Sequence, residues 1–173
     1  LGQLDICCSV NPFLGREADP AAPKADPAKR IVVVGAGPAG MEAACRARER
    51  GHDVTLIDKG KRVGGQLLLA AAPPGRKDIE LFTDYLAGRL ARSGVKVFLN
   101  EEISLARIRS LRPDAVILAT GARPLMLDIP GLAADRAMTA WDVLAGKPAP
   151  GGPFLVVGAG LVGCETADFL SEA

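Results

Sequence analysis

The fold of this chain is decided by the stretch Arg30-Ile-Val-Val-Val-Gly-Ala-Gly-Pro-Ala-Gly40. Its four apolar residues 31–34 form a short run, which is typical of a strand buried on both faces of a parallel sheet. Three glycines follow at the G-x-G-x-x-G spacing, and residues 41–50 then predict a helix. Residues 54–57 predict the next strand, which runs into Asp58. This order predicts a Rossmann-like βαβ unit.

The three glycines and the acid fit the binding of a dinucleotide. Gly35 permits the tight turn after the strand, Gly37 lets the backbone approach a pyrophosphate, and Gly40 lets the helix pack closely. The free N–H groups and the dipole at the start of the helix would hold the phosphate charge. Asp58 stands where it can accept hydrogen bonds from a ribose. We therefore predict a dinucleotide site rather than an ordinary glycine turn.

Composition and charge exclude several classes of protein. The 173 residues suffice for a domain with a sizeable core, and the net charge of +1 gives no reason to expect a nucleic-acid partner. No apolar run reaches the roughly 18 residues of a membrane span, and the start at Leu1 has no features of a signal peptide. The four cysteines form no disulfide framework. We therefore expect an α/β protein of the cytoplasm.

The first 29 residues differ in composition from the rest. Residues 1–15 contain the adjacent pair Cys7-Cys8, whereas residues 16–29 are rich in alanine, proline and alternating charges. The second composition is typical of an extended linker. Residues 1–29 are therefore expected to be the tail of an upstream segment with its linker.

Residues 30–150 are expected to form one Rossmann-like domain. Its further predicted elements are a glycine-rich loop at Gly64-Gly65-Gln66, helices over residues 78–92, 104–111 and 139–144, and strands over residues 95–99 and 115–118. The last of these strands runs into Ala119-Thr120-Gly121. Ligands in open α/β sheets lie at such carboxyl ends, and small residues there leave room for them.

The glycine pattern returns near the end of the sequence. It consists of a predicted strand over residues 154–157, the glycines Gly158, Gly160 and Gly163, and Glu165 in a following helix. Residues 151–173 are therefore expected to be the first β-α unit of an incomplete second nucleotide domain, whose apolar residues either pack on the first sheet or stay exposed. We expect such a design to bind a flavin dinucleotide at one site and a nicotinamide dinucleotide at the other.

These motifs together resemble flavoproteins that contain two dinucleotide-binding domains. Several branches share them, among them the small chain of glutamate synthase and enzymes similar to thioredoxin reductase. The segment Cys8-Ser9-Val10-Asn11-Pro12 resembles the last cysteine motif of a narrower group. That group contains 2,4-dienoyl-CoA reductase, enoate reductase and trimethylamine dehydrogenase, which join a flavin barrel of the old-yellow-enzyme type to an iron–sulfur segment and a nucleotide module.

The resemblance implies an FAD site in the first domain and the start of an NAD(P)H site in the second. The implied FAD-binding residues are Gly35, Gly37, Pro38, Ala39, Gly40, Asp58, Lys59, Gly65, Gln66, Ile103, Ala119, Thr120 and Gly121. The implied NAD(P)H-binding residues are Gly158, Gly160, Gly163 and Glu165. Members similar to trimethylamine dehydrogenase hold ADP where others hold FAD, and the sequence leaves both open.

The resemblance also implies a chemistry for a larger enzyme. Cys8 would be the fourth ligand of a 4Fe-4S cluster whose other cysteines lie upstream of Leu1, so we expect no cluster on this chain alone. Electrons would pass from NAD(P)H to FAD, and through the cluster to FMN in the upstream barrel, which reduces an enoate or dienoyl-type double bond. The alternatives are a structural ADP-binding module and a flavoprotein similar to the glutamate synthase small chain.

No catalytic acid or base is expected within these residues. His52, the only histidine, is predicted to lie at the surface, and Cys45 and Cys164 are predicted to pack in helix cores. The redox chemistry would belong to the cofactors, and the protein would bind and orient them.

Overall fold

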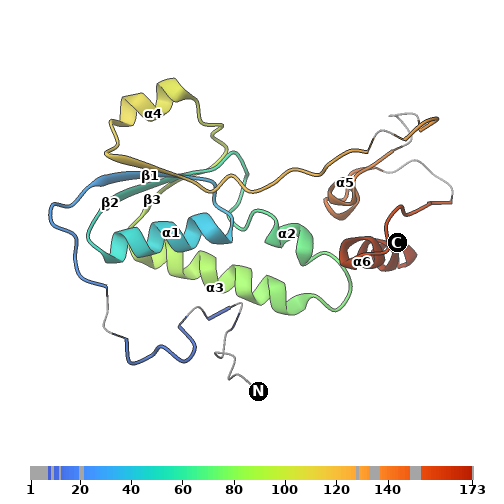
Figure 1. The fold of residues 1–173 in the computed structure, drawn as a ribbon, viewed down its shortest axis with the longest axis horizontal. Helices are drawn as coiled ribbons and strands as arrows, with labels where there is room; N and C mark the ends of the chain where they lie inside the picture. Colours follow the sequence, from blue (N-terminus) through green and yellow to red (C-terminus); the bar gives the residue numbers. More distant parts are fainter. Residues whose placement is uncertain are drawn as a thin grey trace, which may run out of the picture.

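The molecule is built around a parallel sheet (Figure 1). The computed structural model describes residues 8, 10–11, 13–19, 22–127, 129–132, 137–148 and 153–172. Within them, the sheet has the order β3-β2-β1-β4. Its strands are β1 (Arg30–Val34), β2 (Asp53–Ile57), β3 (Lys96–Phe98) and β4 (Ala115–Leu118). Because β1 pairs with β2 on one side and with β4 on the other, the direction of winding reverses at β1. The predicted Rossmann-like fold is confirmed.

Helices cover both faces of the sheet. Helices α1 (Pro38–Glu49) and α3 (Lys77–Ser93) lie on one face, and α4 (Leu105–Leu111) lies on the other (Figure 1). The remaining helices are α2 (Leu67–Ala70), α5 (Ala140–Leu144) and α6 (Leu161–Ser171). These three lie beyond the edge where the parallel strands end (Figure 1). None of the helices in the described part of the chain is both long and apolar enough to cross a bilayer.

Alternation along β1 divides the hydrophobic core in two. The core below α1 and α3 contains Ile31, Val33, Met41, Leu56 and Leu86. The core on the α4 face contains Val32, Val34 and Ile57, with Ile103 and Leu111 packed against them. Because successive side chains of a strand point to opposite faces, this arrangement buries β1 on both sides, as its continuous apolar run predicts.

Local signals place most helix ends within a few residues of the prediction. Helix α1 begins at Pro38, because proline suits the first turn of a helix. Helix α3 begins one residue before the predicted 78–92 range and ends at Ser93, before Gly94 with its left-handed φ of 77°. Ser104 caps α4 by accepting a hydrogen bond from the Arg107 N–H at 3.2 Å. Thr139 and Asp142 form a capping box at α5.

The predicted strand over residues 154–157 is wrong. Residues 153–159 form no strand in the structure, and they are not part of the sheet. A strand depends on a neighbour for its ladder hydrogen bonds, so an apolar run without a partner remains irregular. Leu155 is 89 % exposed and Val157 is 68 % exposed. Packing of this unit on the first sheet is therefore excluded, and exposure of its apolar residues is confirmed.

The segment before β1 is fixed to the end of α1. Ala25 donates its N–H to the Arg50 carbonyl at 2.8 Å, and the Lys24 ammonium donates to the Glu49 carbonyl at 2.7 Å. Lys29 donates its N–H to Nδ1 of His52 at 3.0 Å. His52 is only 8 % exposed, so its predicted surface position is wrong. Its ring is buried because it satisfies a backbone donor of the incoming segment.

Replacing His52 with alanine should loosen residues 22–29. The change leaves the Lys29 N–H without its acceptor, which we expect to cost about 1–3 kcal/mol. Trypsin should then cleave after Lys24 and Lys29 several times faster, as measured by mass spectrometry. The control is His52→Asn, whose side-chain oxygen offers an acceptor close to Nδ1. Equal cleavage of all three proteins would contradict the role of His52.

An ion network joins α1 to α3. Arg46 pairs with Glu42 at 2.8 Å and with Glu49 at 2.6 Å. Arg89 of α3 pairs with both Glu42 and Glu49, and its side chain is 20 % exposed. Burial acts to raise the pKa of Glu49, but the hydrogen bonds and charges of Arg89 and Arg46 outweigh it and lower that pKa. The network therefore stabilises the ionised carboxylate in the folded state.

Replacing Arg89 with methionine should lower the free energy of unfolding at neutral pH. It should also make this free energy depend less on pH in the acid range. A carboxylate whose pKa is lowered by folding contributes stability above its unfolded pKa, and this contribution is lost as the pH falls through the folded pKa. We expect a loss of about 1–2 kcal/mol at pH 7, since Glu49 is half-exposed. As the pH falls through the lowered folded-state pKa of Glu49, the unfolding free energies of the variant and the parent, measured in urea, should converge. A constant difference from pH 7 to pH 3 would contradict this.

Candidate functional site

The first glycine loop leaves β1 in a conformation that only glycine allows. Gly35 has a φ of +106°, and a Cβ built on it would overlap the Ala119 carbonyl of the neighbouring strand end. A Cβ on Gly40 would overlap the carbonyl of Gly35. The loop is held by the Gly35 N–H, which donates to the Ile57 carbonyl at 2.8 Å. The positive φ of Gly35 agrees with its predicted role in the tight turn, and the close contact at Gly40 agrees with its predicted role in packing.

Gly37 faces open space at the start of α1. A Cβ built on it would meet nothing within 4 Å, and its extended backbone caps the helix. Pro38 follows as the first helical residue, and the N–H groups of Ala39 and Gly40 donate to no protein acceptor among the described residues. Open space beside free N–H groups at a helix N-terminus suits a phosphate.

Asp58 lies against the loop and has two backbone partners. Its Oδ2 accepts from the Ala36 N–H at 2.5 Å, and its Oδ1 accepts from the Gly60 N–H at 2.6 Å. A carboxylate oxygen has more than one lone pair, so both oxygens can also accept ribose hydroxyls. Asp58 therefore supports the loop in addition to its predicted ligand role. No sequence pattern indicates the hydrogen bonds that Asp58 accepts from the Ala36 and Gly60 N–H groups.

Two further segments close around Gly37. The Gly64 N–H donates to the Ala36 carbonyl at 2.8 Å, and a Cβ on Gly65 would touch the Gly37 Cα. The Gln66 amide reaches Gly121, where a Cβ would lie 2.9 Å from Nε2. Ala119 and Thr120 border Gly35. The structure thus brings together the predicted residues of the first loop, of the Gly65-Gln66 loop and of the segment after β4.

The other predicted residues of the first site lie at its margin. Lys59 is exposed next to Asp58. The side chain of Ile103 packs into the core on the α4 face, so only its backbone can serve a ligand. Cofactor contacts of Lys59 and of the Ile103 backbone therefore stay predictions.

The second glycine loop has the same backbone geometry as the first. Gly158 has a φ of +111°, and a Cβ on Gly163 would overlap the Gly158 carbonyl. Gly160 faces open space and caps α6 with φ −78° and ψ 179°, close to the −72° and −180° of Gly37. Cys164 donates its N–H to the Gly160 carbonyl at 3.0 Å, as Met41 does to Gly37 at 2.9 Å. The second loop therefore adopts the backbone geometry of the first loop without a flanking strand.

An ion pair links the second loop to the first domain. Glu165, in the first turns of α6, pairs with Arg76 at the start of α3. Arg76 was not predicted as a functional residue, because a partner so distant in sequence leaves no local pattern. Its place after the Pro73-Pro74-Gly75 turn marks only the start of a helix. In this structure, the carboxylate of Glu165 is therefore already paired with a protein side chain.

The cysteines differ in their surroundings. Cys8 is exposed, and backbone hydrogen bonds from Asn11 and Val10 lower the pKa of its thiol. Among the described residues, no three His, Cys, Asp or Glu side chains gather as metal ligands, so a cluster at Cys8 requires ligands from elsewhere. Cys45 is buried as predicted, and burial raises the pKa of its thiol. Cys164 is exposed, so its predicted core position is wrong.

Comparison with known proteins assigns a family to this geometry. A family model described as pyridine nucleotide-disulphide oxidoreductase matches residues 29–173. The NADH oxidase of Thermoanaerobacter brockii is 45 % identical over 174 residues, which cover 98 % of this chain and 27 % of that protein. The cinnamate reductase of Clostridium sporogenes is 40 % identical over 167 residues, which cover 96 % of this chain and 25 % of that protein.

A solved structure agrees with both relatives. The complex of 2-naphthoyl-CoA reductase with 2-naphthoyl-CoA superposes with a TM-score of 0.88 at 35 % identity, over 95 % of this chain and 25 % of that one. The chain thus spans about a quarter of the length of the relatives it matches. These similarities confirm the resemblance to the enoate reductase group. The chain belongs to the pyridine nucleotide-disulphide oxidoreductase family.

Proposed function

We propose that this chain is the electron-input module of a flavin oxidoreductase similar to the enoate reductases. In this proposal, residues 30–150 bind FAD, and residues 151–173 begin the NAD(P)H domain. The observation that supports it most strongly is the repeated glycine loop, in which Gly37 and Gly160 share one backbone geometry and one open approach. Two such loops on one chain suit two dinucleotides.

The residues of the first site have distinct roles in this proposal. The N–H groups of Ala39 and Gly40 hold the FAD pyrophosphate beside Gly37, and Pro38 sets the helix start. Asp58 accepts from the adenosine ribose, and the backbone of Ile103 contacts the adenine edge with Lys59 nearby. The remaining contacts along the cofactor come from Gly35, Gly65, Gln66, Ala119, Thr120 and Gly121. The site fits the group because the glycine cradle leaves room where any Cβ would intrude.

The second site carries the nicotinamide nucleotide in this proposal. Gly158, Gly160 and Gly163 shape the loop. Glu165 orients the start of α6 through its ion pair with Arg76. FAD held at the first site would supply the hydride-accepting and single-electron chemistry. The chain itself would bind FAD and contribute the first loop of the NAD(P)H site.

The wider enzyme is part of the same proposal. Cys8 lies upstream of the nucleotide domain with a lowered thiol pKa, which suits a thiolate ligand of a 4Fe-4S cluster. The cluster would connect FAD to FMN in an upstream barrel that reduces an enoate-type double bond. The names of the relatives, an NADH oxidase and a cinnamate reductase, support an oxidoreductase of this kind.

Binding of FAD and of ADP to the purified chain tests the proposal. Flavin absorbance, flavin fluorescence and calorimetry should report FAD binding that is clearly tighter than ADP binding, because the isoalloxazine adds contacts. Equal affinities would favour the alternative of a structural ADP module, in which only the adenosine diphosphate half is held. Binding of neither ligand would reject the first glycine loop as a competent site in this chain.

A further inference from the structure

The segment that precedes β1 is held to α1 at two places. Residues 13–19 run on the side of α1 and α3 that faces away from the sheet, and residues 22–29 lead from there to β1 (Figure 1). The composition of residues 16–29 predicts an extended linker. The contacts of the segment instead follow one helix, first in its middle and then at its end.

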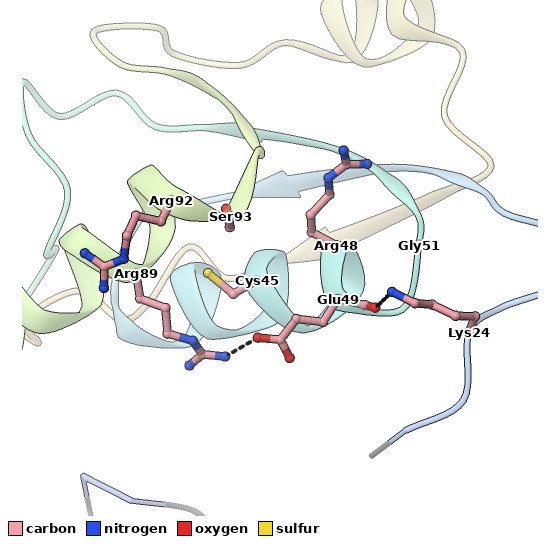
Figure 2. A pocket seen from close by; sticks show the side chains of 8 residues that line it. All are labelled: Lys24, Cys45, Arg48, Glu49, Gly51, Arg89, Arg92 and Ser93. Carbon is pink, nitrogen blue, oxygen red and sulfur yellow. Dashed lines mark hydrogen bonds and ion pairs between the residues drawn. The ribbon is translucent and has the colours of Figure 1, made fainter.

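The contact at the end of α1 consists of three hydrogen bonds in a row. Nε of Arg50 donates to the Pro23 carbonyl at 3.4 Å, and the Lys24 ammonium donates to the Glu49 carbonyl at 2.7 Å (Figure 2). The Ala25 N–H donates to the Arg50 carbonyl at 2.8 Å. These bonds satisfy carbonyls at the helix end and join residues 23–25 to it.

The contact in the middle of α1 is made by an aromatic ring. The guanidinium carbon of Arg46 lies 4.2 Å from the centroid of the Phe13 ring, which is within the range of a cation–π interaction. Nε of Arg46 pairs with Glu42, and its Nη1 pairs with Glu49. The N–H groups of a guanidinium point outward in its plane, so the two carboxylates fix this plane and leave its flat face for a ring.

The backbone around Phe13 is folded into turns. The Phe13 N–H donates to Oδ1 of Asn11 at 3.0 Å, a contact that commonly supports turns. The Leu14 N–H donates to the Asn11 carbonyl at 3.2 Å, and the Arg16 N–H donates to the Phe13 carbonyl at 2.8 Å. The Asp19 N–H donates to the Arg16 carbonyl at 3.0 Å. A folded backbone therefore presents the ring to Arg46.

We propose that the outer face of α1, with Arg46 at its centre, is a docking surface for residues 13–19 of this chain, and that docking keeps Cys8 close to α1. Phe13 follows Cys8 by five positions, so the cysteine stays within about 18 Å of the docked ring. Docking uses only contacts of the chain itself and does not depend on FAD. One consequence rests on the proposed function: a cluster with Cys8 as a ligand would be held near the FAD domain.

Paramagnetic broadening of amide signals tests the docking in the whole chain. A nitroxide is attached to Cys8 after Cys7→Ser and Cys164→Ser, while Cys45 is protected by its burial. Signal intensities are compared with those of the reduced label. We expect strong broadening at the Glu42 and Glu49 amides, and none over α4 on the other face of the sheet. Equal broadening of α1 and α4, as from a free tether, would overturn the proposal.

Two conservative variants test the ring contact. Phe13→Leu keeps an apolar side chain without the π face, and should lower the ratio of docked to undocked segment about two- to fivefold, which reduces the broadening of α1. Arg46→Lys keeps the charge without the planar face and should act similarly. The double variant should lose little more, because both changes remove one contact.

Arg109→Lys on α4 is the matched control and should leave the broadening unchanged. The same broadening in the parent, in Phe13→Leu and in Arg46→Lys would overturn the docking surface. FAD affinity is measured on the same proteins and should not differ among them. A chain that fails to bind FAD but shows the expected broadening would reject the FAD site and keep the docking.

Discussion

Replacing Gly40 with alanine should destabilise the chain by about 3 kcal/mol and abolish FAD binding. The added methyl group would overlap the Gly35 carbonyl. Gly35 cannot move aside, because its N–H is bonded to Ile57 and its Cα borders Ala119. Helix α1 must therefore shift away from β1, where Met41 is fully buried. Urea unfolding followed by circular dichroism measures the first effect, and flavin fluorescence measures the second.

Two glycine-to-alanine changes serve as controls for Gly40. Gly88 lies within α3, where a Cβ would meet only the flexible end of Arg92. Gly88→Ala should therefore stabilise the chain by about 0.5–1 kcal/mol through its helix propensity.

Gly163→Ala creates the same overlap as Gly40→Ala, but in the second loop. Because Leu161 and Val162 beside it are exposed, we expect little change in the unfolding midpoint. Similar losses at Gly40 and Gly163 would contradict the packing argument.

The glycine loops show which part of this structure is encoded locally. Gly35 and Gly158 take nearly the same φ, although one follows a buried strand and the other follows an irregular segment. The spacing of the glycines and the helix that follows are enough to set this geometry. For this reason the sequence could predict both loops, the buried β1 and the gathering of Asp58 near Gly37.

Features that depend on distant partners could not be predicted. Residues 154–157 have the composition of a strand, but a strand also needs a neighbour, which composition does not supply. His52 is buried because Lys29 needs an acceptor, a contact that joins residues on either side of α1. The Arg76–Glu165 pair likewise joins separate segments of the chain.

Replacing Asp58 with alanine should damage the first site in two ways. The Ala36 N–H is fully buried and would lose its acceptor, which we expect to cost about 1–3 kcal/mol of stability. The ribose of FAD would also lose its charged acceptor, and this should weaken FAD binding about 10- to 100-fold. Thermal unfolding without ligand measures the first effect, and flavin titration measures the second. Asp84→Ala, at an exposed position of α3, is the matched control.

The variant Asp58→Asn separates the two roles of this residue. An asparagine keeps one oxygen, which can still accept from Ala36, but its amide group is a donor and faces the Gly60 N–H. We therefore expect the asparagine variant to recover most of the stability while its FAD binding remains weaker than that of the parent chain. If this variant instead binds FAD as the parent does, the carboxylate is not a ribose acceptor. Asp58 would then serve the loop alone, and the adenosine half of the cofactor would depend on the backbone near Ile103.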